Sequence, residues 1–368
     1  MTHAAITGWA EAMPPAVLSN ADLATFLDTD DAWIASRTGI RERRIAHVPG
    51  VALASVAAAR ALACAGLAAH ELEMVVYGSC SYDEQVPNCA SGVQLAIGAS
   101  RAAAMDINTA CTSFLYGLSS ASALIRAGTL RNALVVGVEV VSPYMDWSNR
   151  NVAVLFGDGC AAVVLEASEE PCGIIGDKLG CYADARDILR VRGVGARYAN
   201  RDVAYGDTEW DFDGAEIYRR AVAGMGEAAA EALARSGHVA ADIDLAVPHQ
   251  ANLRIIEAVA KKTGIAMDRV HLTIERYGNM SAATVPVALT DALAAARVKP
   301  HALLLTPAFG GGLTWCAQVI RWGERVTPKD VSDVALPPCT RSALEIVDGY
   351  RRIKADRMRS AAGLSASR

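Results

Sequence analysis

Asp106-Ile-Asn-Thr-Ala-Cys111-Thr-Ser-Phe-Leu-Tyr-Gly117 joins an apolar run to a segment with helical spacing. Residues 102–107 are typical of a short buried strand, and the apolar residues between Phe114 and Ile125 recur every three or four positions, as on one helix face. We therefore expect Cys111 at a strand-to-helix turn. The free backbone N–H groups and the helix dipole at such a turn favour a thiolate, which makes Cys111 a candidate nucleophile. Taken alone, the pattern also fits a small buried hydrophobic residue.

The composition is that of a folded globular protein. The chain has 368 residues, 52% of them hydrophobic and 20% charged, enough for two domains or one duplicated domain. A net charge of −5 gives no sign of nucleic-acid binding. The nine cysteines are scattered and odd in number, which favours a reducing cytosol and no structural zinc. With no window of about 18 uncharged apolar residues and no secretory pattern after Met1, we expect a cytoplasmic protein without membrane association.

The predicted elements occur twice in similar order. Residues 74–166 indicate a strand, a helix, a short strand, the helix after Cys111 and two more strands. Residues 243–321 repeat that order, with short strands at 243–248 and 270–273, after a long helix at 214–236. This repeated order predicts a duplicated α/β domain, in which ligands bind at the carboxyl ends of the strands. Polar groups of both halves are then expected to meet where the halves join.

Two polar motifs and a glycine-rich loop follow strands in the second half: Val247-Pro-His249-Gln-Ala-Asn-Leu-Arg254, Tyr277-Gly-Asn279-Met-Ser-Ala-Ala-Thr284 and Ala308-Phe-Gly-Gly-Gly312. His249 and Asn279 each stand at the end of an element. Taken singly, His249 fits an ordinary buried histidine and Asn279 a helix cap. The consecutive N–H groups of the loop fit either an oxyanion site or a plain flexible turn.

In the first half, Trp33 and Arg37 are four residues apart on a predicted helix. They would share one face and clamp a flat heteroaromatic ring by stacking and cation–π contact. The alternative is a surface tryptophan covered by its neighbouring arginine.

Together these motifs resemble the β-ketoacyl-acyl carrier protein synthase III family of the thiolase superfamily. The resemblance runs from Ile6 to Trp322 and rests on D-I-x-x-A-C, V-P-H-Q-A-N, G-N-x-S-A-A, R-T-G-I-R-E-R, F-G-D-G and A-F-G-G-G-L-T-W, in the family's order and spacing. It implies a homodimer with an α/β fold, the thiolase-like duplicated αβαβα five-layer fold. Residues 1–168 would form the half that carries the nucleophilic cysteine, and residues 169–323 the half that carries the histidine and asparagine.

The resemblance also implies a chemistry. Cys111, His249 and Asn279 would form a triad, with an oxyanion held by the amides of Cys111 and Gly311. An acyl group from acyl-CoA is loaded on Cys111, and decarboxylative Claisen condensation with malonyl-acyl carrier protein or malonyl-CoA follows, in fatty-acid or polyketide biosynthesis. No tightly bound cofactor or metal is implied, because the coenzyme A thioester is a substrate. The alternatives are an acyltransferase that passes the group to an alcohol, amine or carrier thiol without decarboxylation, and a non-catalytic partner subunit.

Peripheral roles also follow from the resemblance. The resemblance implies that coenzyme A is bound by Trp33, Arg37, Arg150 and Asn252. It implies that the acyl pocket is formed by Val86, Asn151 and Tyr218. Val86 stands where a residue of the family, often Phe, reaches across the dimer into the partner's pocket. Carrier-protein docking falls to a basic face made of Arg219, Arg254, Lys261 and Lys262, for which an ordinary solvated face is the alternative.

Two further segments lie outside the motifs named above. Residues 182–210 match the region where relatives place a cap over the substrate entrance. Residues 324–368 extend past the usual end of the fold, with a basic amphipathic helix expected at 342–359. We expect a disordered or partner-contacting appendage there and assign it no role.

Overall fold

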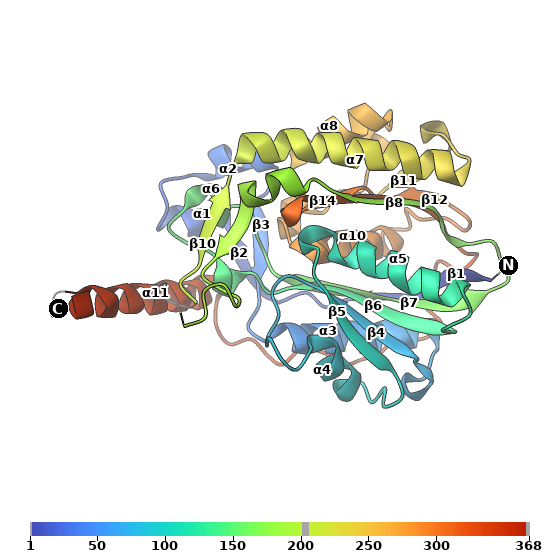
Figure 1. The fold of residues 1–368 in the computed structure, drawn as a ribbon, viewed down its shortest axis with the longest axis horizontal. Coiled ribbons are helices and arrows are strands. Elements are labelled where there is room, and N and C mark those ends of the chain that lie inside the picture. The colour runs from blue at the N-terminus through green and yellow to red at the C-terminus, as the bar shows by residue number, and fades with distance from the viewer. Residues whose placement is uncertain (1, 201–205, 366–368) are drawn as a thin grey trace.

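The computed structural model describes residues 2–200 and 206–365, which form five layers (Figure 1). From the bottom to the top of that view the layers are α3 with α4, a first sheet, α5 with α10, a second sheet, and α7 with α8. This is the αβαβα arrangement that the family resemblance implies.

The first sheet has the order β1 (His3–Glu11), β7 (Gly159–Ser168), β6 (Asn132–Glu139), β4 (Met74–Gly78) and β5 (Ala103–Ile107). The second sheet contains β8 (Gly173–Cys181), β14 (Thr314–Arg321), β12 (Leu303–Leu305), β11 (Leu245–Ala246) and β13 (Ala308–Gly310). Two hairpins lie outside the sheets: β2 (Ala16–Ser19) with β3 (Glu42–Ile45), and β9 (Leu189–Arg192) with β10 (Glu209–Phe212). The α-helices are α1 (Asn20–Ala24), α2 (Asp31–Thr38), α3 (Gly50–Ala65), α4 (Cys89–Ala96), α5 (Ser113–Arg126), α6 (Arg150–Ala153), α7 (Gly214–Ser236), α8 (Leu253–Thr263), α9 (Ile274–Tyr277), α10 (Thr284–Ala294) and α11 (Ala343–Ser365).

The strand pairings repeat between the halves, in agreement with the duplication predicted from the order of the elements. In the first sheet β1 and β7 are antiparallel, β7 and β6 antiparallel, and β6, β4 and β5 parallel. In the second, β8, β14 and β12 are antiparallel neighbours and β12 and β11 are parallel. The place of β5 is taken by a single parallel bridge between Ala246 and Val270, so the strand predicted at 270–273 is wrong. The Gln250 side chain instead accepts the N–H groups of Thr273 and Ile274, at 3.0 and 3.2 Å, and ends the pairing.

The middle layer is the most completely apolar part of the core. Phe114 and Leu118 of α5 pack with Val285 and Leu289 of α10 and with strands of both sheets, and all four side chains are almost fully buried. A helix covered by a sheet on each side must be apolar nearly all round. This layer brings the N-terminus of α5, next to Cys111, close to the loops of the second half.

The two halves join between β7, which ends at Ser168, and β8, which begins at Gly173. We propose the division at 168/169 on this basis, with residues 169–323 as the second half.

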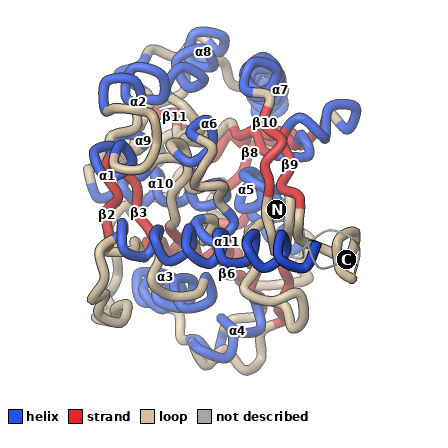
Figure 2. Tube along the Cα trace, turned by 90° about the vertical axis from the view of Figure 1, so that its left-hand side faces the viewer, coloured by secondary structure: helices blue, strands red, loops and turns tan. Residues whose placement is uncertain are grey.

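The C-terminal segment is ordered where it meets the body of the protein. Ala343, Ile346 and Val347 are buried in the core beside the β2–β3 hairpin, and α11 crosses that face of the molecule (Figure 2). The Lys354 ammonium donates to the Thr208 carbonyl at 3.0 Å, which ties α11 to the segment before β10. The expectation of a disordered appendage is therefore wrong for the first turns of α11, because its apolar residues complete a core cluster. Among the described helices, none is long and apolar enough to span a membrane.

Candidate active site

Cys111 lies at the turn between β5 and α5, as predicted. It belongs to a single 3₁₀ turn, Ala110–Thr112, that leads directly into α5. Ala110 has a φ of 52°, in the left-handed region that residues other than glycine rarely adopt. Such backbone strain costs on the order of 1–3 kcal/mol and is typical of functional sites. Its effect here is to hold the cysteine in a tight turn at the end of a buried strand.

The Cys111 thiol differs from the sequence expectation. Burial raises the pKa of the Cys111 thiol to about 12, and the nearby Glu139 carboxylate adds to the rise. The Ser281 hydroxyl and the backbone N–H groups of Cys111 and Gly311 contact the sulfur and lower the pKa in part. The prediction of a thiolate favoured by the helix terminus is wrong for the free protein, because desolvation outweighs those dipoles. A base must therefore take the thiol proton during reaction.

This state of Cys111 predicts a distinct pH dependence. Below its pKa, the thiolate fraction of a thiol rises tenfold for each pH unit. We therefore expect alkylation of Cys111 by iodoacetamide to accelerate about tenfold per pH unit from about pH 6 to pH 9. Peptide mass spectrometry separates Cys111 from the other cysteines, and an unfolded model peptide with one cysteine is the control that levels off near the ordinary pKa of about 8.5. A Cys111 rate that reached its plateau below about pH 8 would restore the thiolate prediction.

His249 lies between β11 and α8 with its ring buried. Its backbone N–H donates to the Pro307 carbonyl at 2.9 Å, which fixes the residue beside the end of the second sheet. The ring Nδ1 is 2.5 Å from the Thr284 hydroxyl oxygen. Burial lowers the pKa of the imidazole to about 3, so His249 is neutral at physiological pH. A neutral ring can accept a proton at one nitrogen or donate one, depending on its tautomer.

Asn279 follows Gly278, whose φ of 63° turns the chain between α9 and α10. The Asn279 backbone bonds to Leu155 and Gly157, and its side-chain oxygen accepts the Ser281 N–H at 2.8 Å. Because that oxygen is occupied, the amide NH₂ is the group that Asn279 offers to a ligand.

A cavity of about 440 Å³ brings the three predicted residues together. Cys111, His249 and Asn279 all line it, from three different loops. The rest of its wall is mainly apolar and includes Leu155, Phe156, Ile217, Met225 and Phe309. An apolar cavity with a few convergent polar groups is typical of a substrate site.

The glycine loop approaches the nucleophile closely. A Cβ on Gly310 would lie 2.8 Å from the Cys111 backbone nitrogen, so a side chain there would displace the turn. The next residue, Gly311, contacts the sulfur through its N–H. The N–H groups of Cys111 and Gly311 thus both lie beside the sulfur, where the carbonyl oxygen of a bound acyl group could accept from them as an oxyanion.

The residues predicted to bind coenzyme A are also neighbours. The guanidinium carbons of Arg37 and Arg150 lie 4.5 and 4.9 Å from the centre of the Trp33 ring. Asn252 caps α8 and donates to the Arg37 carbonyl at 3.1 Å. Trp33, Arg37 and Asn252 line the cavity, and Arg150 reaches the indole from α6. These contacts assemble a cationic aromatic cluster at the cavity.

The predicted docking residues lie on α7 and α8, which run side by side at the top of Figure 1. Arg254, Lys261 and Lys262 are exposed on α8, and Arg219 is exposed on α7. Arg219 forms an ion pair with Glu216, and Arg254 donates to the Ser36 carbonyl at 2.9 Å. The two lysines are therefore the more available charges of this basic face.

The three predicted acyl-pocket residues divide into two groups. Asn151 and Tyr218 line the cavity, whereas Val86 is 83% exposed and lies outside it. The role predicted for Val86 concerns a partner's cavity and stays a prediction.

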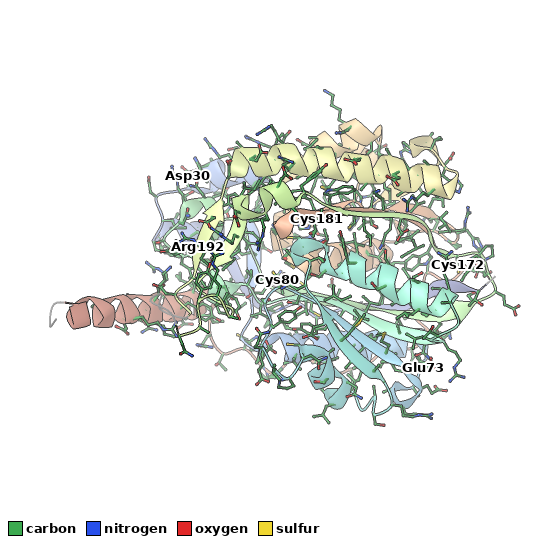
Figure 3. All side chains as sticks on the ribbon, viewed as in Figure 1. Asp30, Glu73, Cys80, Cys172, Cys181 and Arg192 are labelled. Carbon is green, nitrogen blue, oxygen red and sulfur yellow. The ribbon has the colours of Figure 1, made fainter. Side chains whose placement is uncertain are left out.

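The segment predicted to cap the entrance contains the β9–β10 hairpin. Leu189 and Phe212 of this hairpin line the cavity, and Trp210 donates to the Tyr144 carbonyl at 2.8 Å. Arg192, labelled in Figure 3, pairs with Glu209 across the hairpin at 2.7 Å. Residues 201–205 of the predicted cap lie outside the described residues.

Sequence reasoning missed three polar residues around the site. Glu139 is fully buried and accepts the Ser79 hydroxyl at 2.6 Å and the Cys80 thiol at 3.0 Å; Figure 3 labels Cys80. Ser281 contacts the Cys111 sulfur, and Thr284 contacts His249. Two signals in the sequence could have identified them. Glu139 is an acidic residue at the end of an apolar strand, and Ser281 and Thr284 are hydroxyl residues two and five positions after Asn279.

Comparison with known proteins agrees with this geometry. The family profile described as "3-Oxoacyl-[acyl-carrier-protein (ACP)] synthase III" matches residues 105–183, and the corresponding C-terminal profile matches residues 233–322. Beta-ketoacyl-[acyl-carrier-protein] synthase III 2 of Vibrio cholerae is 52% identical over 345 residues, covering 94% of this chain and 95% of the relative. Beta-ketoacyl-[acyl-carrier-protein] synthase III of Roseiflexus castenholzii is 45% identical over 324 residues, covering 87% and 98%.

Solved structures show the same similarity. The 3-oxoacyl-(acyl carrier protein) synthase III of Pseudomonas aeruginosa superposes with a TM-score of 0.81 at 37% identity, covering 90% of this chain and 100% of its own. The priming β-ketosynthase from the R1128 polyketide biosynthetic pathway gives a TM-score of 0.83 at 31% identity, covering 88% and 97%. With its cysteine, histidine and asparagine gathered in one cavity and relatives of this identity along most of its length, the chain belongs to the β-ketoacyl-[acyl-carrier-protein] synthase III family.

Proposed function

We propose that this protein is a decarboxylative condensing enzyme that joins an acyl group from acyl-CoA to a malonyl thioester. The observation that carries the proposal is the meeting of Cys111, His249 and Asn279 in one cavity, with two backbone N–H groups at the sulfur. The product is a 3-oxoacyl thioester. The names of the relatives, which include acyl-carrier-protein synthases and a polyketide priming ketosynthase, support this class of reaction.

The first half-reaction loads the acyl group. The Cys111 thiol gives its proton to neutral His249, and the sulfur attacks the carbonyl carbon of the acyl-CoA. The N–H groups of Cys111 and Gly311 stabilise the oxyanion of the tetrahedral intermediate. The carbon–sulfur bond to coenzyme A then breaks, and the departing thiolate recovers the proton from His249. The acyl group remains on Cys111.

The second half-reaction forms the carbon–carbon bond. His249 Nε2–H and the Asn279 amide donate to the carbonyl oxygen of the malonyl thioester, and loss of CO₂ leaves an enolate held by those donors. The enolate carbon attacks the acyl-cysteine carbonyl, and the bond to the sulfur breaks. The sulfur takes up a proton from water. The departing carboxylate supplies the driving force, so the reaction requires no metal or redox cofactor.

Coenzyme A acts in this scheme only as an acyl carrier. Its adenine would stack on Trp33 in place of one guanidinium, since both Arg37 and Arg150 contact that ring in the free protein. Asn252, at the cavity wall, would bond to the arm that leads to the thioester.

The alternative is an acyltransferase that passes the group to an alcohol, amine or thiol without loss of CO₂. The presence of Asn279 in the cavity favours condensation, because a neutral donor in addition to His249 is needed chiefly to hold an enolate. We also propose a homodimer, in which Val86 of one chain shapes the acyl pocket of the other.

A direct test uses the unmodified protein. It is incubated with a panel of acyl-CoAs, the mass gained by the intact protein is measured, and malonyl-acyl carrier protein or malonyl-CoA is then added. The proposal expects a retained acyl mass, followed by CO₂ release and loss of that mass. Transfer of the acyl group to another acceptor without CO₂ would support the acyltransferase instead.

The basic face of α8 is proposed to dock an acidic carrier protein. Replacing Lys261 and Lys262 together by Glu should raise the KM for malonyl-acyl carrier protein by about tenfold, because two attractive contacts become repulsive. The KM for malonyl-CoA should stay at the parental value, and this is the internal control. Equal carrier-protein kinetics in parent and variant would remove the docking role.

A further inference from the structure

The Thr284 hydroxyl lies between two groups that compete for it. Its oxygen is 2.5 Å from His249 Nδ1 and 2.9 Å from the Ser281 carbonyl oxygen. Thr284 is fully buried at the start of α10, and His249 is 2% exposed. Among the described residues, the His249 ring makes no other hydrogen bond.

A threonine hydroxyl has one hydrogen and can also accept, so this site has two complete arrangements. In the first, the hydroxyl donates to the Ser281 carbonyl and accepts Nδ1–H, which leaves His249 Nε2 as a bare acceptor. In the second, the hydroxyl rotates and donates to Nδ1, and Nε2 carries the proton. The bond between Thr284 and the ring is kept in both.

We infer that Thr284 is a positioning residue that lets neutral His249 take either tautomer, one for each half-reaction. The inference rests on the proposed condensing function. Loading requires a bare Nε2 that accepts the Cys111 proton, and decarboxylation requires Nε2–H as a donor to the enolate oxygen. Once Cys111 carries the acyl group, it has no S–H proton left to give to Nε2. Nδ1 faces the buried Thr284 hydroxyl, so the change of tautomer requires the ring to turn briefly away from Thr284. Water then gives one proton to Nε2 and takes one from Nδ1, and no other reactant is needed.

A purely local role for Thr284 is the competing explanation. A threonine in the first turn of a helix commonly bonds to a carbonyl three residues earlier, as Thr284 does with Ser281. The contact with His249 is different, because it joins residues 35 positions apart from two separate loops. Burial agrees with the inference, since it lowers the pKa of His249 to about 3 and keeps the ring neutral, the form that has two tautomers.

Two substitutions separate these roles. Thr284→Val keeps the shape and removes the hydroxyl, whereas Thr284→Ser keeps the hydroxyl and removes a methyl group. We expect Thr284→Val to slow both acyl loading and CO₂ release by about ten- to a hundredfold, the usual consequence of leaving a buried polar atom without its partner. Thr284→Ser should stay within about threefold of the parent in both. Thermal unfolding of each variant shows whether the fold is retained.

The decisive measurement is the tautomer of His249 itself. In protein labelled with ¹⁵N-histidine, the ring nitrogen shifts identify the protonated nitrogen, and His249→Ala assigns the signal among the seven histidines. We expect Nδ1–H in the free parent and Nε2–H after loading with acyl-CoA alone. Thr284→Ser should show the same change, and Thr284→Val should not.

Each outcome bears on one of the two claims. A parent that gains the acyl mass and releases CO₂ but keeps one His249 tautomer throughout would overturn the inference and leave the proposed function intact. Parental rates in a folded Thr284→Val protein would overturn it as well. A parent that neither gains acyl mass nor releases CO₂ from malonyl-CoA would overturn the proposed function, and the inference with it.

Discussion

Replacement of Cys111 by Ala is expected to abolish acyl loading and condensation while leaving decarboxylation in place. The sulfur is the atom that would carry the acyl group, so without it no covalent intermediate forms, and condensation should fall by about 10⁴-fold or more. His249 and Asn279 still face the cavity in this variant. They can still hold an enolate formed from a malonyl thioester. CO₂ release from malonyl-CoA should therefore continue without a 3-oxoacyl product.

Intact-protein mass spectrometry and release of labelled CO₂ measure the two effects. The matched control is Cys64→Ala, which removes a buried thiol from α3, outside the cavity, and should gain the acyl mass as the parent does. Acyl mass on Cys111→Ala protein would mean that another residue is the nucleophile.

The converse result is expected for Asn279→Ala and His249→Ala. Both should still gain the acyl mass, because the loading oxyanion is held by the backbone N–H groups of Cys111 and Gly311. His249→Ala should load more slowly, since the thiol, with a pKa of about 12, then lacks its base. Removing one preorganised donor from a developing oxyanion typically costs about 10²–10³ in rate. CO₂ release should fall by that factor in each variant.

A second substitution of Asn279 isolates the donor. The Asn279 side-chain oxygen also accepts the Ser281 N–H, so Asn279→Ala removes a loop contact together with the amide. Asn279→Asp keeps an acceptor for Ser281 but has no NH₂, and it should lose CO₂ release as fully as the alanine variant. Condensation near the parental rate in Asn279→Asp would contradict the decarboxylative role and favour the acyltransferase.

The fold was predictable in outline because its signals are local. The strand before Cys111, the helix after it and the glycine turns each follow from periodicity and turn chemistry within a dozen residues. The duplication could be recognised because both halves repeat that order. The absence of a strand at 270–273 could not be predicted. The Thr273 N–H donates to the Gln250 side chain, which lies more than twenty residues away in the sequence.

The C-terminal segment shows the same limit. Its amphipathic helix was predictable, but its attachment was not. Ile346 and Val347 are buried because the β2–β3 hairpin, some 300 residues earlier, presents an apolar face to them. A segment's own pattern predicts an apolar stripe and not what covers it.

The sequence by itself predicted element ends at Cys111, His249 and Asn279 from short-range spacing, and the family resemblance assigned these three residues to a triad. The protonation of those residues was decided by the tertiary structure alone. A helix terminus predicts a thiolate at Cys111, yet burial leaves a neutral thiol beside a neutral imidazole, with pKa values of about 12 and 3. Desolvation depends on every segment packed around a group, and the Thr284 contact with His249 depends on two loops meeting. Both depend on segments that are far apart in the sequence, so the local spacing of residues cannot predict them.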